Sequence, residues 1–385
     1  MASTTTPVLT LTNPTDAERV RLATGTHPQW GGGLDLQTYI ARETDSVGPL
    51  NRDGGLVPWL LTEAGAPPDS RPLLSSCDTL RKRALVREKG SGGEVRDCLA
   101  QGVASVFTPE DKRGKGYAGR MMALLSETLK ARADEAEGTS EQQALFSILY
   151  SDVGKDIYAR RGWKALESTH FQFPVDAGRE YTLPAGVRYI TGTEVPELTA
   201  LDERLLRERL ASGPEQDPSR TAVAILPDKE HMLWHFNREG LKAAQLYPST
   251  PLPDVHGAIV TTPSSSSRIW ALWSRKLRSR DVSANSLYFL RFVIEKPEDV
   301  SDEELGDAFE KIVEAARKYA KESACGKVQM WTPGDRVRKV AESRQSLKDT
   351  EHVVRETDSI VSLNWFGEGS VDDVDWIIPE QYTWC

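Results

Sequence analysis

The segment from Val103 to Met122 constrains the fold of this chain more than any other. It starts with a run of β-forming residues, Val103 to Thr108, and reaches a turn interrupted by glycines, Arg113-Gly-Lys-Gly-Tyr-Ala118. Apolar residues then recur at steps of three and four, which predicts one buried helix face made of Tyr117, Met121, Leu124, Leu125 and Leu129. The pattern therefore predicts a strand, a glycine-containing turn and a helix in direct succession.

This turn has the composition of an anion-binding loop. Glycines let several backbone N–H groups point at one spot, and a helix N-terminus adds about half a positive charge there. Such a loop can hold a pyrophosphate. It is not a P-loop, because Gly116 is followed by Tyr117 and not by Lys and Ser or Thr. Taken alone, the turn leaves an ordinary strand-to-helix connection open.

A second segment lies a short distance downstream. Ala144 to Tyr150 has the pattern of a buried strand, and a short segment then leads through Tyr158 to Gly162 and Trp163. The two segments together resemble the GNAT-type N-acetyltransferases. Residues 113–118 fit the family's Q/R-x-x-G-x-G/A turn, and the second segment fits its Tyr-x-x-x-Gly-aromatic motif.

The resemblance implies an α/β (α+β) GNAT core with a central mixed, splayed sheet, and acetyl-CoA as co-substrate. In the family, the tyrosine at the place of Tyr158 protonates the departing CoA thiolate; the alternative is a packing tyrosine. Many relatives carry asparagine where this chain has Ser151. The residues expected to bind the cofactor are Val106, Phe107, Thr108, Arg113, Gly114, Lys115, Gly116, Tyr117, Ala118 and Ser151.

The second half repeats the order of the first, with three predicted strands, a helix and a strand. This repetition predicts a second, degenerate GNAT-like domain. Its connection at 296–301 has no glycine and could not hold a pyrophosphate. We therefore expect a catalytic, acetyl-CoA-binding domain at 1–175, which the strand at 168–173 completes. A linker at 176–186 and a C-terminal domain at 187–385, whose tail returns to the active site, would follow.

Composition and charge exclude several classes of function. The chain has 385 residues, 39% of them hydrophobic and 27% charged, and a net charge of −9. The acidic C-terminal stretch argues against nucleic acid as a partner and favours a cationic amine. No apolar run approaches the roughly 18 residues of a membrane span, and the N-terminus lacks the pattern of a secretory signal. We expect a cytoplasmic protein without a membrane partner.

No metal is expected either. The four cysteines lie far apart and form no C-x-x-C pair. His231 and His235 have the four-residue spacing of a helical zinc site, but no third ligand is near them in the sequence, and the apolar residues between them favour packing.

A narrower resemblance covers nearly the whole chain. Residues 81–86, 103–122, 145–163 and 382–385 look like the fungal lysine N6-acetyltransferase family, whose members acetylate the side-chain amine of free L-lysine. The likeness implies lysine as acceptor and leaves open a polyamine, another amino acid or an amine-bearing metabolite. A second class of function, an acetyl-CoA-binding module that docks a protein partner, also stays open. The sequence does not predict the oligomeric state.

The chain terminus supplies one further expectation. A lysine amine has a pKa of about 10.4, so a nearby base has to accept its proton at neutral pH. The chain ends in an apolar, aromatic stretch, Trp376 to Cys385, that carries a free carboxylate. Similar two-part acetyltransferases of mycobacteria thread their C-terminus into the catalytic centre. We expect the Cys385 carboxylate to lie near Tyr158 and to bind or deprotonate the amine.

Overall fold

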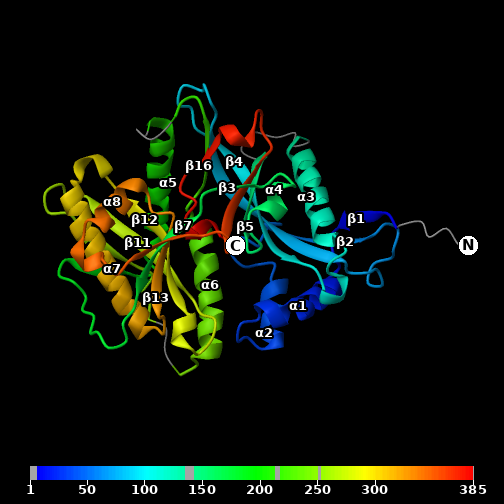
Figure 1. The fold of residues 1–385 in the computed structure, drawn as a ribbon, viewed down its shortest axis with the longest axis horizontal. Coiled ribbons are helices and arrows are strands. Elements are labelled where there is room, and N and C mark those ends of the chain that lie inside the picture. The colour runs from blue at the N-terminus through cyan, green and yellow to red at the C-terminus, as the bar shows by residue number, and fades with distance from the viewer. Residues whose placement is uncertain (1–6, 135–142, 213–216, 250–252, 385) are drawn as a thin grey trace, which may run out of the picture.

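The computed structural model describes residues 7–134, 143–212, 217–249 and 253–384, and these form two mixed β-sheets with helices on their faces (Figure 1). In Figure 1 the first sheet lies to the right and the second to the left, and the described end of the chain reaches the space between them. The predicted fold class, a mixed α/β architecture, is confirmed.

The first sheet has nine strands in the order β1-β2-β3-β4-β5-β15-β6, with β9 paired to β3 and β16 to β9. Strands β4 and β5 are parallel neighbours at its centre. The strand bounds are β1 Leu9–Thr12, β2 Leu56–Glu63, β3 Ser75–Arg87, β4 Arg96–Phe107, β5 Ala144–Ser151, β6 Lys164–Ala165, β9 Thr221–Ile225, β15 Ile360–Trp365 and β16 Val374–Trp376.

The second sheet has seven strands in the order β14-β7-β13-β12-β11-β10-β8. Strands β12 and β13 pair in parallel, as the counterpart of β4 with β5 in the first sheet. The bounds are β7 Thr169–Pro174, β8 Val187–Ile190, β10 Gly257–Thr261, β11 Arg268–Lys276, β12 Ser286–Ile294, β13 Lys327–Trp331 and β14 Glu351–Val354. The predicted repetition of strand and helix order is therefore present as two related sheets.

The helices divide between the sheets in the same way. Helix α3 packs on the first sheet and α7 on the second, and α1 and α2 form a pair beside β2 and β3. The bounds are α1 Asp16–Trp30, α2 Leu36–Thr44, α3 Tyr117–Asp134, α4 Asp156–Ala159, α5 Val195–Ser212, α6 Lys229–Leu246, α7 Asp302–Glu322 and α8 Asp335–Glu342. Sequence patterns did not predict α8.

One strand belongs to a different sheet from the one expected. The strand at 168–173 was expected to complete the first domain, and this is wrong, because β7 pairs with β13 and β14 of the second sheet. Phe171 and Phe173 of β7 are buried in the core beneath α7, where they remove a large apolar area from water. Strand β15, from near the chain end, takes the place between β5 and β6.

The two sheets share a hydrophobic core. It contains Ile148 of β5, Trp270 of β11, Leu290 of β12 and Tyr382 near the chain end, each at most 1% exposed. Strands β9 and β16, which the sequence patterns did not predict, extend the first sheet from the second half of the chain. The two halves of the chain therefore contribute strands to each other's sheet and share one hydrophobic core. This shared packing holds the two sheets in a fixed relative position.

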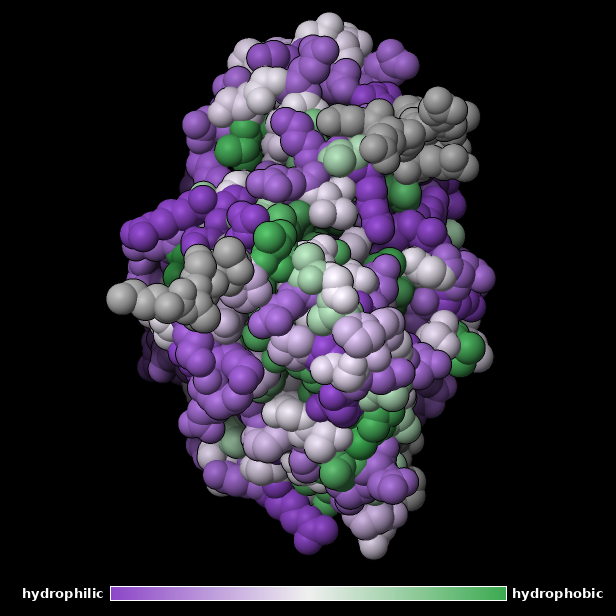
Figure 2. All heavy atoms as spheres, turned by 90° about the vertical axis from the view of Figure 1, so that its right-hand side faces the viewer, coloured by the Kyte–Doolittle hydropathy of each residue, from purple (hydrophilic) through white to green (hydrophobic). Residues whose placement is uncertain are grey.

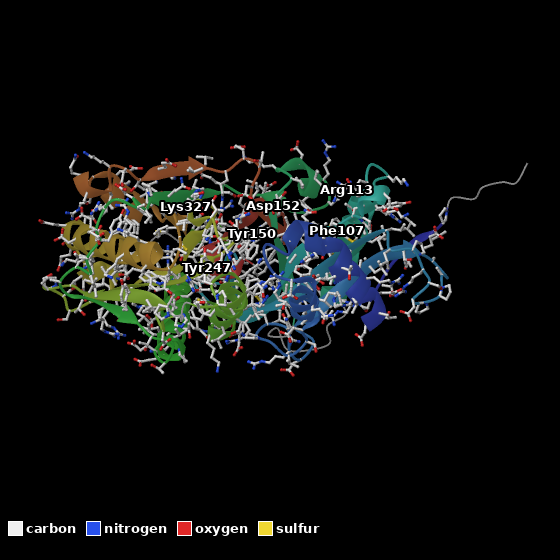
Figure 3. The ribbon with its side chains drawn as sticks, turned by 90° about the horizontal axis from the view of Figure 1, so that it is seen from below. Phe107, Arg113, Tyr150, Asp152, Tyr247 and Lys327 are labelled. Atoms are coloured by element: carbon white, nitrogen blue, oxygen red, sulfur yellow. The ribbon has the colours of Figure 1, made fainter. Side chains whose placement is uncertain are left out.

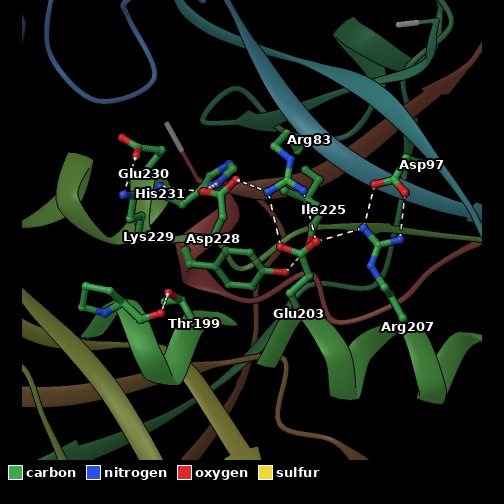
Figure 4. A network of polar contacts seen from close by, with 12 residues as sticks. Arg83, Asp97, Thr199, Glu203, Arg207, Ile225, Asp228, Lys229, Glu230 and His231 are labelled. Carbon is green, nitrogen blue, oxygen red and sulfur yellow. Dashed lines mark hydrogen bonds and ion pairs between the residues drawn. The ribbon is translucent and has the colours of Figure 1, made fainter. Parts of the chain in front are cut away.

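Ion pairs reinforce this junction at its outer edge (Figure 4). Arg207 of α5 contacts Asp97 of β4 at 2.7 Å, and Arg83 of β3 contacts Glu203 of α5 at 3.1 Å. These pairs are partly exposed, so each contributes at most about 1 kcal/mol.

Hydrophilic residues dominate one end of the molecule (Figure 2). Figure 2 shows the end of the molecule that lies to the right in Figure 1, where apolar residues form small patches among polar ones. Within the described residues, none of the helices has both the length and the apolar character needed to cross a membrane.

Candidate functional site

The turn after β4 has two residues in a backbone conformation that favours glycine. A single helical turn covers Glu110–Lys112 before α3 begins at Tyr117. Gly114 and Gly116 have φ angles of +75° and +79°, in the left-handed region. A Cβ at either position would meet no atom within 4 Å, so conformation and not crowding calls for glycine. The turn thus presents its backbone at the N-terminus of an 18-residue helix, where an anion is stabilised.

A pocket of about 720 Å³ opens at this turn. One wall consists of Thr108, residues 112–114 and residues 116–119, and the other of residues 153–157, Arg160 and Arg161. Five of the lining side chains are basic (Lys112, Arg113, Lys155, Arg160 and Arg161), and only Asp156 is acidic. This charge, together with the helix N-terminus, suits a polyphosphate group.

The predicted cofactor residues divide into two groups. Thr108, Arg113, Gly114, Gly116, Tyr117 and Ala118 line the pocket, and Val106, Phe107, Lys115 and Ser151 are not among its lining residues. Lys115 donates to the backbone oxygen of Asp111 at 3.3 Å. Ser151 bonds to Gly154 O at 2.6 Å and accepts from Val153 N–H at 3.2 Å, so its hydroxyl shapes the second wall.

Sequence reasoning missed that second wall. Arg161 fixes it, because its Nε donates to Gly119 O of α3 at 2.8 Å and its Nη1 to Ile157 O of α4 at 2.7 Å. The basic residues at 155, 160 and 161 surround Tyr158 in the sequence. That cluster of basic residues was the available signal.

The splay predicted between the central strands is present. Parallel pairing of β4 with β5 runs from Leu99↔Ala144 to Val103↔Leu149 and ends there, although β4 continues to Phe107 and β5 to Ser151. Ser105 has a φ of +54°, and the register of β4 against β3 shifts in the same region. The backbone around Val106 is therefore turned away from regular pairing at the end of the sheet that carries the pocket.

Tyr158 lies beside the place where β4 and β5 stop pairing. It is 9% exposed on α4 and packs in one apolar cluster with Cys77 of β3, Val103 of β4 and Leu149 of β5. Burial raises the pKa of Tyr158 to about 12, with smaller contributions from Cys77 and Asp152. The phenol therefore stays protonated at neutral pH and can donate a hydrogen bond or a proton.

A second, smaller recess lies where the strands splay. It has a volume of about 40 Å³ and is lined by residues of α1, α2, β2, β3 and β4, among them Glu43, Asp78 and Ser105. Burial, and next the charge of Glu43, raise the pKa of Asp78 to about 7, against a hydrogen bond from Ser105 that lowers it. A carboxyl group with such a pKa can accept a proton near neutral pH. Sequence reasoning missed it, because nothing in the β3 pattern sets Asp78 apart.

The chain end reaches the space between the sheets. The Tyr382 hydroxyl donates to Ile225 O at 2.6 Å, and Thr383 and Tyr150 of β5 share a hydrogen bond between their hydroxyls. Trp384 stands edge to face with Trp234 of α6, ring centroids 5.9 Å apart. Cys385, the predicted catalytic terminus, lies outside the described residues.

The two spaced histidines act as packing residues. Nδ1 of His231 pairs with Asp228 at 2.8 Å, and Nε2 of His235 lies 3.3 Å from Tyr382 O. Burial lowers the pKa of both histidines. Across the described part of the chain, His, Cys, Asp and Glu side chains form no group of three that could hold a metal ion.

Comparison with known proteins agrees with this geometry. Residues 170–385, more than half of the chain, match the family described as the LYC1 GNAT-like C-terminal domain. The chain belongs to this LYC1-like GNAT family. It is similar to a Yarrowia lipolytica protein named lysine acetyltransferase, at 26% identity over 312 residues, which are 71% of this chain and 73% of that protein.

Two further proteins are similar to this chain, one in sequence and one in fold. An uncharacterized Saccharomyces cerevisiae protein is 26% identical over 247 residues, 56% of this chain and 62% of the yeast protein's length. The crystal structure of Saccharomyces cerevisiae N-myristoyltransferase with bound myristoyl-CoA has a similar fold, with a TM-score of 0.50 and 10% identity, covering 95% of this chain and 85% of that one. The predicted membership in the GNAT superfamily is thus confirmed.

Proposed function

We propose that this protein is an acetyl-CoA-dependent N-acetyltransferase that acetylates a small cationic amine, the N6 amine of free L-lysine. The observation that carries the proposal is the placement of Tyr158. This protonated, buried phenol lies where β4 and β5 part, beside the basic pocket at the N-terminus of α3. A pyrophosphate held in the pocket would direct the rest of an acyl-CoA toward the splay, where the thioester would meet Tyr158.

Acetyl-CoA fits the residues that surround this pocket. The N–H groups of the turn, with Arg113, Arg160 and Lys112, would hold its phosphates, and the backbone around Val106, where β4 no longer pairs with β5, would pair with its pantetheine arm. We include Phe107, Lys115 and Ser151 among the proposed cofactor-binding residues, as residues that shape the walls of the pocket. When bound, acetyl-CoA supplies the thioester whose C–S bond breaks as the new N–C bond forms.

Transfer in one step is supported by the state of the cysteines. Cys77, which packs beside Tyr158, is buried, and burial raises its thiol pKa well above the usual value. Burial also raises the pKa of Cys98 and of Cys325 to about 12. A thiol that stays protonated is a poor nucleophile. The amine would therefore attack the thioester directly, and the thiolate would receive its proton from Tyr158.

We assign different tasks to the two carboxylates on the acceptor side. Asp78 would take the proton that the attacking amine loses, since its pKa of about 7 suits that exchange. The Cys385 carboxylate would attract the cationic amine, since Trp384 lies among the groups between the sheets. Residues 1–175 would bind the cofactor and residues 187–385 would complete the acceptor site, joined by the linker at 176–186. We include a cytoplasmic location in the proposal.

Cofactor binding is tested at Gly116. An aspartate side chain at this position adds a negative charge to the turn, and charge-assisted contacts are worth about 1.5–3 kcal/mol each, so Gly116→Asp should weaken acetyl-CoA binding by about 10- to 150-fold. Gly116→Asn has nearly the same shape and the same strained φ, and it should weaken binding much less. Isothermal titration of both variants with acetyl-CoA measures the difference. Equal affinities for the two variants would remove the phosphate assignment.

The acceptor is tested with a panel of amines. Lysine, ornithine, putrescine, cadaverine and an aminoglycoside are offered with acetyl-CoA, while thiol release is followed and the products are identified by mass spectrometry. We expect N6-acetyl-lysine at the highest kcat/KM, with the name of the Yarrowia relative as support. Turnover of another amine alone would keep the reaction class and reject lysine. Binding of acetyl-CoA without release by any amine would favour a binding module that docks a protein partner.

A further inference from the structure

Arg355 carries a buried guanidinium group without a polar partner. The residue is 6% exposed, and its Nε, Nη1 and Nη2 atoms form no hydrogen bond with the rest of the described chain. The group stacks on the ring of Trp331 at 3.9 Å from the centroid. Stacking occupies the face of the guanidinium and leaves its in-plane N–H donors unused. A buried cation without a hydrogen-bond partner is costly, so this arrangement calls for an anionic ligand.

The surroundings of Arg355 form a cluster of aromatic rings with a second cation. The Lys276 ammonium lies 4.8 Å from the ring centroid of Trp384 and 5.7 Å from that of Tyr288. The ring of Trp331 connects the parts, with centroid distances of 6.0 Å to Tyr288 and 5.6 Å to Tyr150. We call Tyr150, Lys276, Tyr288, Trp331, Arg355 and Trp384 the Arg355 cluster. It draws residues from both sheets and from the chain end.

Two carboxylates complete the charge pattern. Asp152 follows β5 and accepts a hydrogen bond from Ser359 N–H at 2.9 Å. The carboxyl group of Asp358, the residue before Ser359, lies next to the carboxyl group of Asp152. Both carboxylates act on Arg355 and on Lys276 through their charges. Positive and negative groups therefore stand next to one another, as an α-amino acid with its carboxylate and ammonium requires.

We propose that Arg355 binds the α-carboxylate of the acceptor through its in-plane N–H groups, with Lys276 beside it, and that the protein selects α-amino acids by this contact. The inference rests on the proposed function and names the group that determines its specificity. A planar guanidinium held flat on a tryptophan offers two parallel N–H···O bonds, which match the geometry of a carboxylate.

The position of Asp152 connects this subsite to the reacting end. Its charge contributes to the raised pKa of Tyr158 and also acts on Arg355, so it lies within electrostatic reach of both. Figure 3 shows Tyr150 and Asp152 close together near the middle of the molecule, with Phe107 and Arg113 on the cofactor side. An acceptor with its carboxylate at Arg355 would extend past Asp152 toward Tyr158. A long side chain that ends in an amine suits this path.

Matched pairs of amines test the proposal. Lysine and cadaverine, and ornithine and putrescine, differ by the carboxylate, so kcat/KM for both members of each pair is measured in the full-length protein and in Arg355→Gln. We expect Arg355→Gln to lower kcat/KM for lysine by about 10- to 150-fold, the range for a lost charge-assisted contact, and to leave cadaverine within about threefold. Arg355→Lys keeps the positive charge but loses the two parallel N–H donors of the guanidinium. Its kcat/KM for lysine should lie between the values of the wild type and Arg355→Gln.

Controls separate this role from a structural one. Arg179→Gln removes an exposed arginine of the linker and should leave kcat/KM unchanged for both lysine and cadaverine. Acetyl-CoA affinity and thermal unfolding are measured in each variant. Equal losses for lysine and cadaverine in Arg355→Gln, or no loss for lysine, would overturn the proposal. A wild-type protein that prefers the diamines would also overturn it, whereas one that binds acetyl-CoA but acetylates no amine would reject the proposed function itself. Lysine titrations of the wild type and Arg355→Gln then test the subsite, and equal binding would overturn it.

Discussion

Tyr158→Phe is expected to lower turnover by about 10²–10⁴-fold, the usual contribution of a general acid, and to leave acetyl-CoA affinity nearly unchanged. The substitution removes one hydroxyl from a side chain that is 9% exposed, and phenylalanine fills the same place in the cluster with Val103 and Leu149. Because the pKa of this phenol is about 12, the proton is present at every pH where the protein is assayed. Steady-state kinetics with acetyl-CoA and lysine measure the effect.

A matched tyrosine distinguishes chemistry from packing. The hydroxyl of Tyr181 accepts a hydrogen bond from Asp176 N–H at 2.9 Å in the linker, so Tyr181→Phe should turn over like the wild type. Full turnover in Tyr158→Phe would reject the role of general acid. Ping-pong kinetics in the wild-type protein would reject direct attack, since that pattern requires an acetylated intermediate.

Asp78→Asn is expected to lower kcat by about 10²–10⁴-fold as well, because the amide cannot accept the proton of the amine. The pKa of about 7 predicts the pH dependence. In the proposed role the carboxylate form of Asp78 is the active one, and its fraction increases as pH rises through 7, so the wild-type kcat/KM should rise between pH 6 and 8.

The chain end is expected to act on acceptor binding. Removing the last two residues, Trp384 and Cys385, takes the terminal carboxylate away from its proposed place, so the KM for the amine should rise.

The carboxyl group of Asp78 also predicts a change in stability with the opposite sign. The folded pKa of Asp78 lies above its ordinary value of 3.8, so the folded state holds a proton that the unfolded state has released. This favourable contribution is full at pH below 4 and is lost as pH rises through 7. Asp78→Asn should therefore raise the melting temperature at pH 8 relative to wild type, and less so at pH 5.

An exposed acid serves as the control for both measurements. Asp335 of α8 is 79% exposed and pairs with Arg338, so Asp335→Asn should keep the wild-type pH profile and kcat. A wild-type pH profile in Asp78→Asn would exclude Asp78 as the base.

Local patterns determined much of the cofactor half. The glycines at 114 and 116, the strand before them and the helix after them predicted a strand, a left-handed turn and a helix in succession, and the structure contains all three. This succeeded because such a turn is a local structure, set by φ angles and helix hydrogen bonds within a few residues. The position of Tyr158 followed from its distance to Gly162 and Trp163 within the family motif. The repeated order of elements likewise predicted the second, related sheet.

Long-range contacts alone decided the part of the molecule that we propose as the acceptor site. Strand β7 left the sheet that its position in the sequence suggested, since Phe171 and Phe173 are buried beneath α7. Strand β15, more than 200 residues beyond β5, pairs beside it. Asp78 and Arg355 look like ordinary charged residues in the sequence. Their raised and lowered pKa values arise only when distant segments bury them, because desolvation depends on what packs around a group and not on its sequence neighbours.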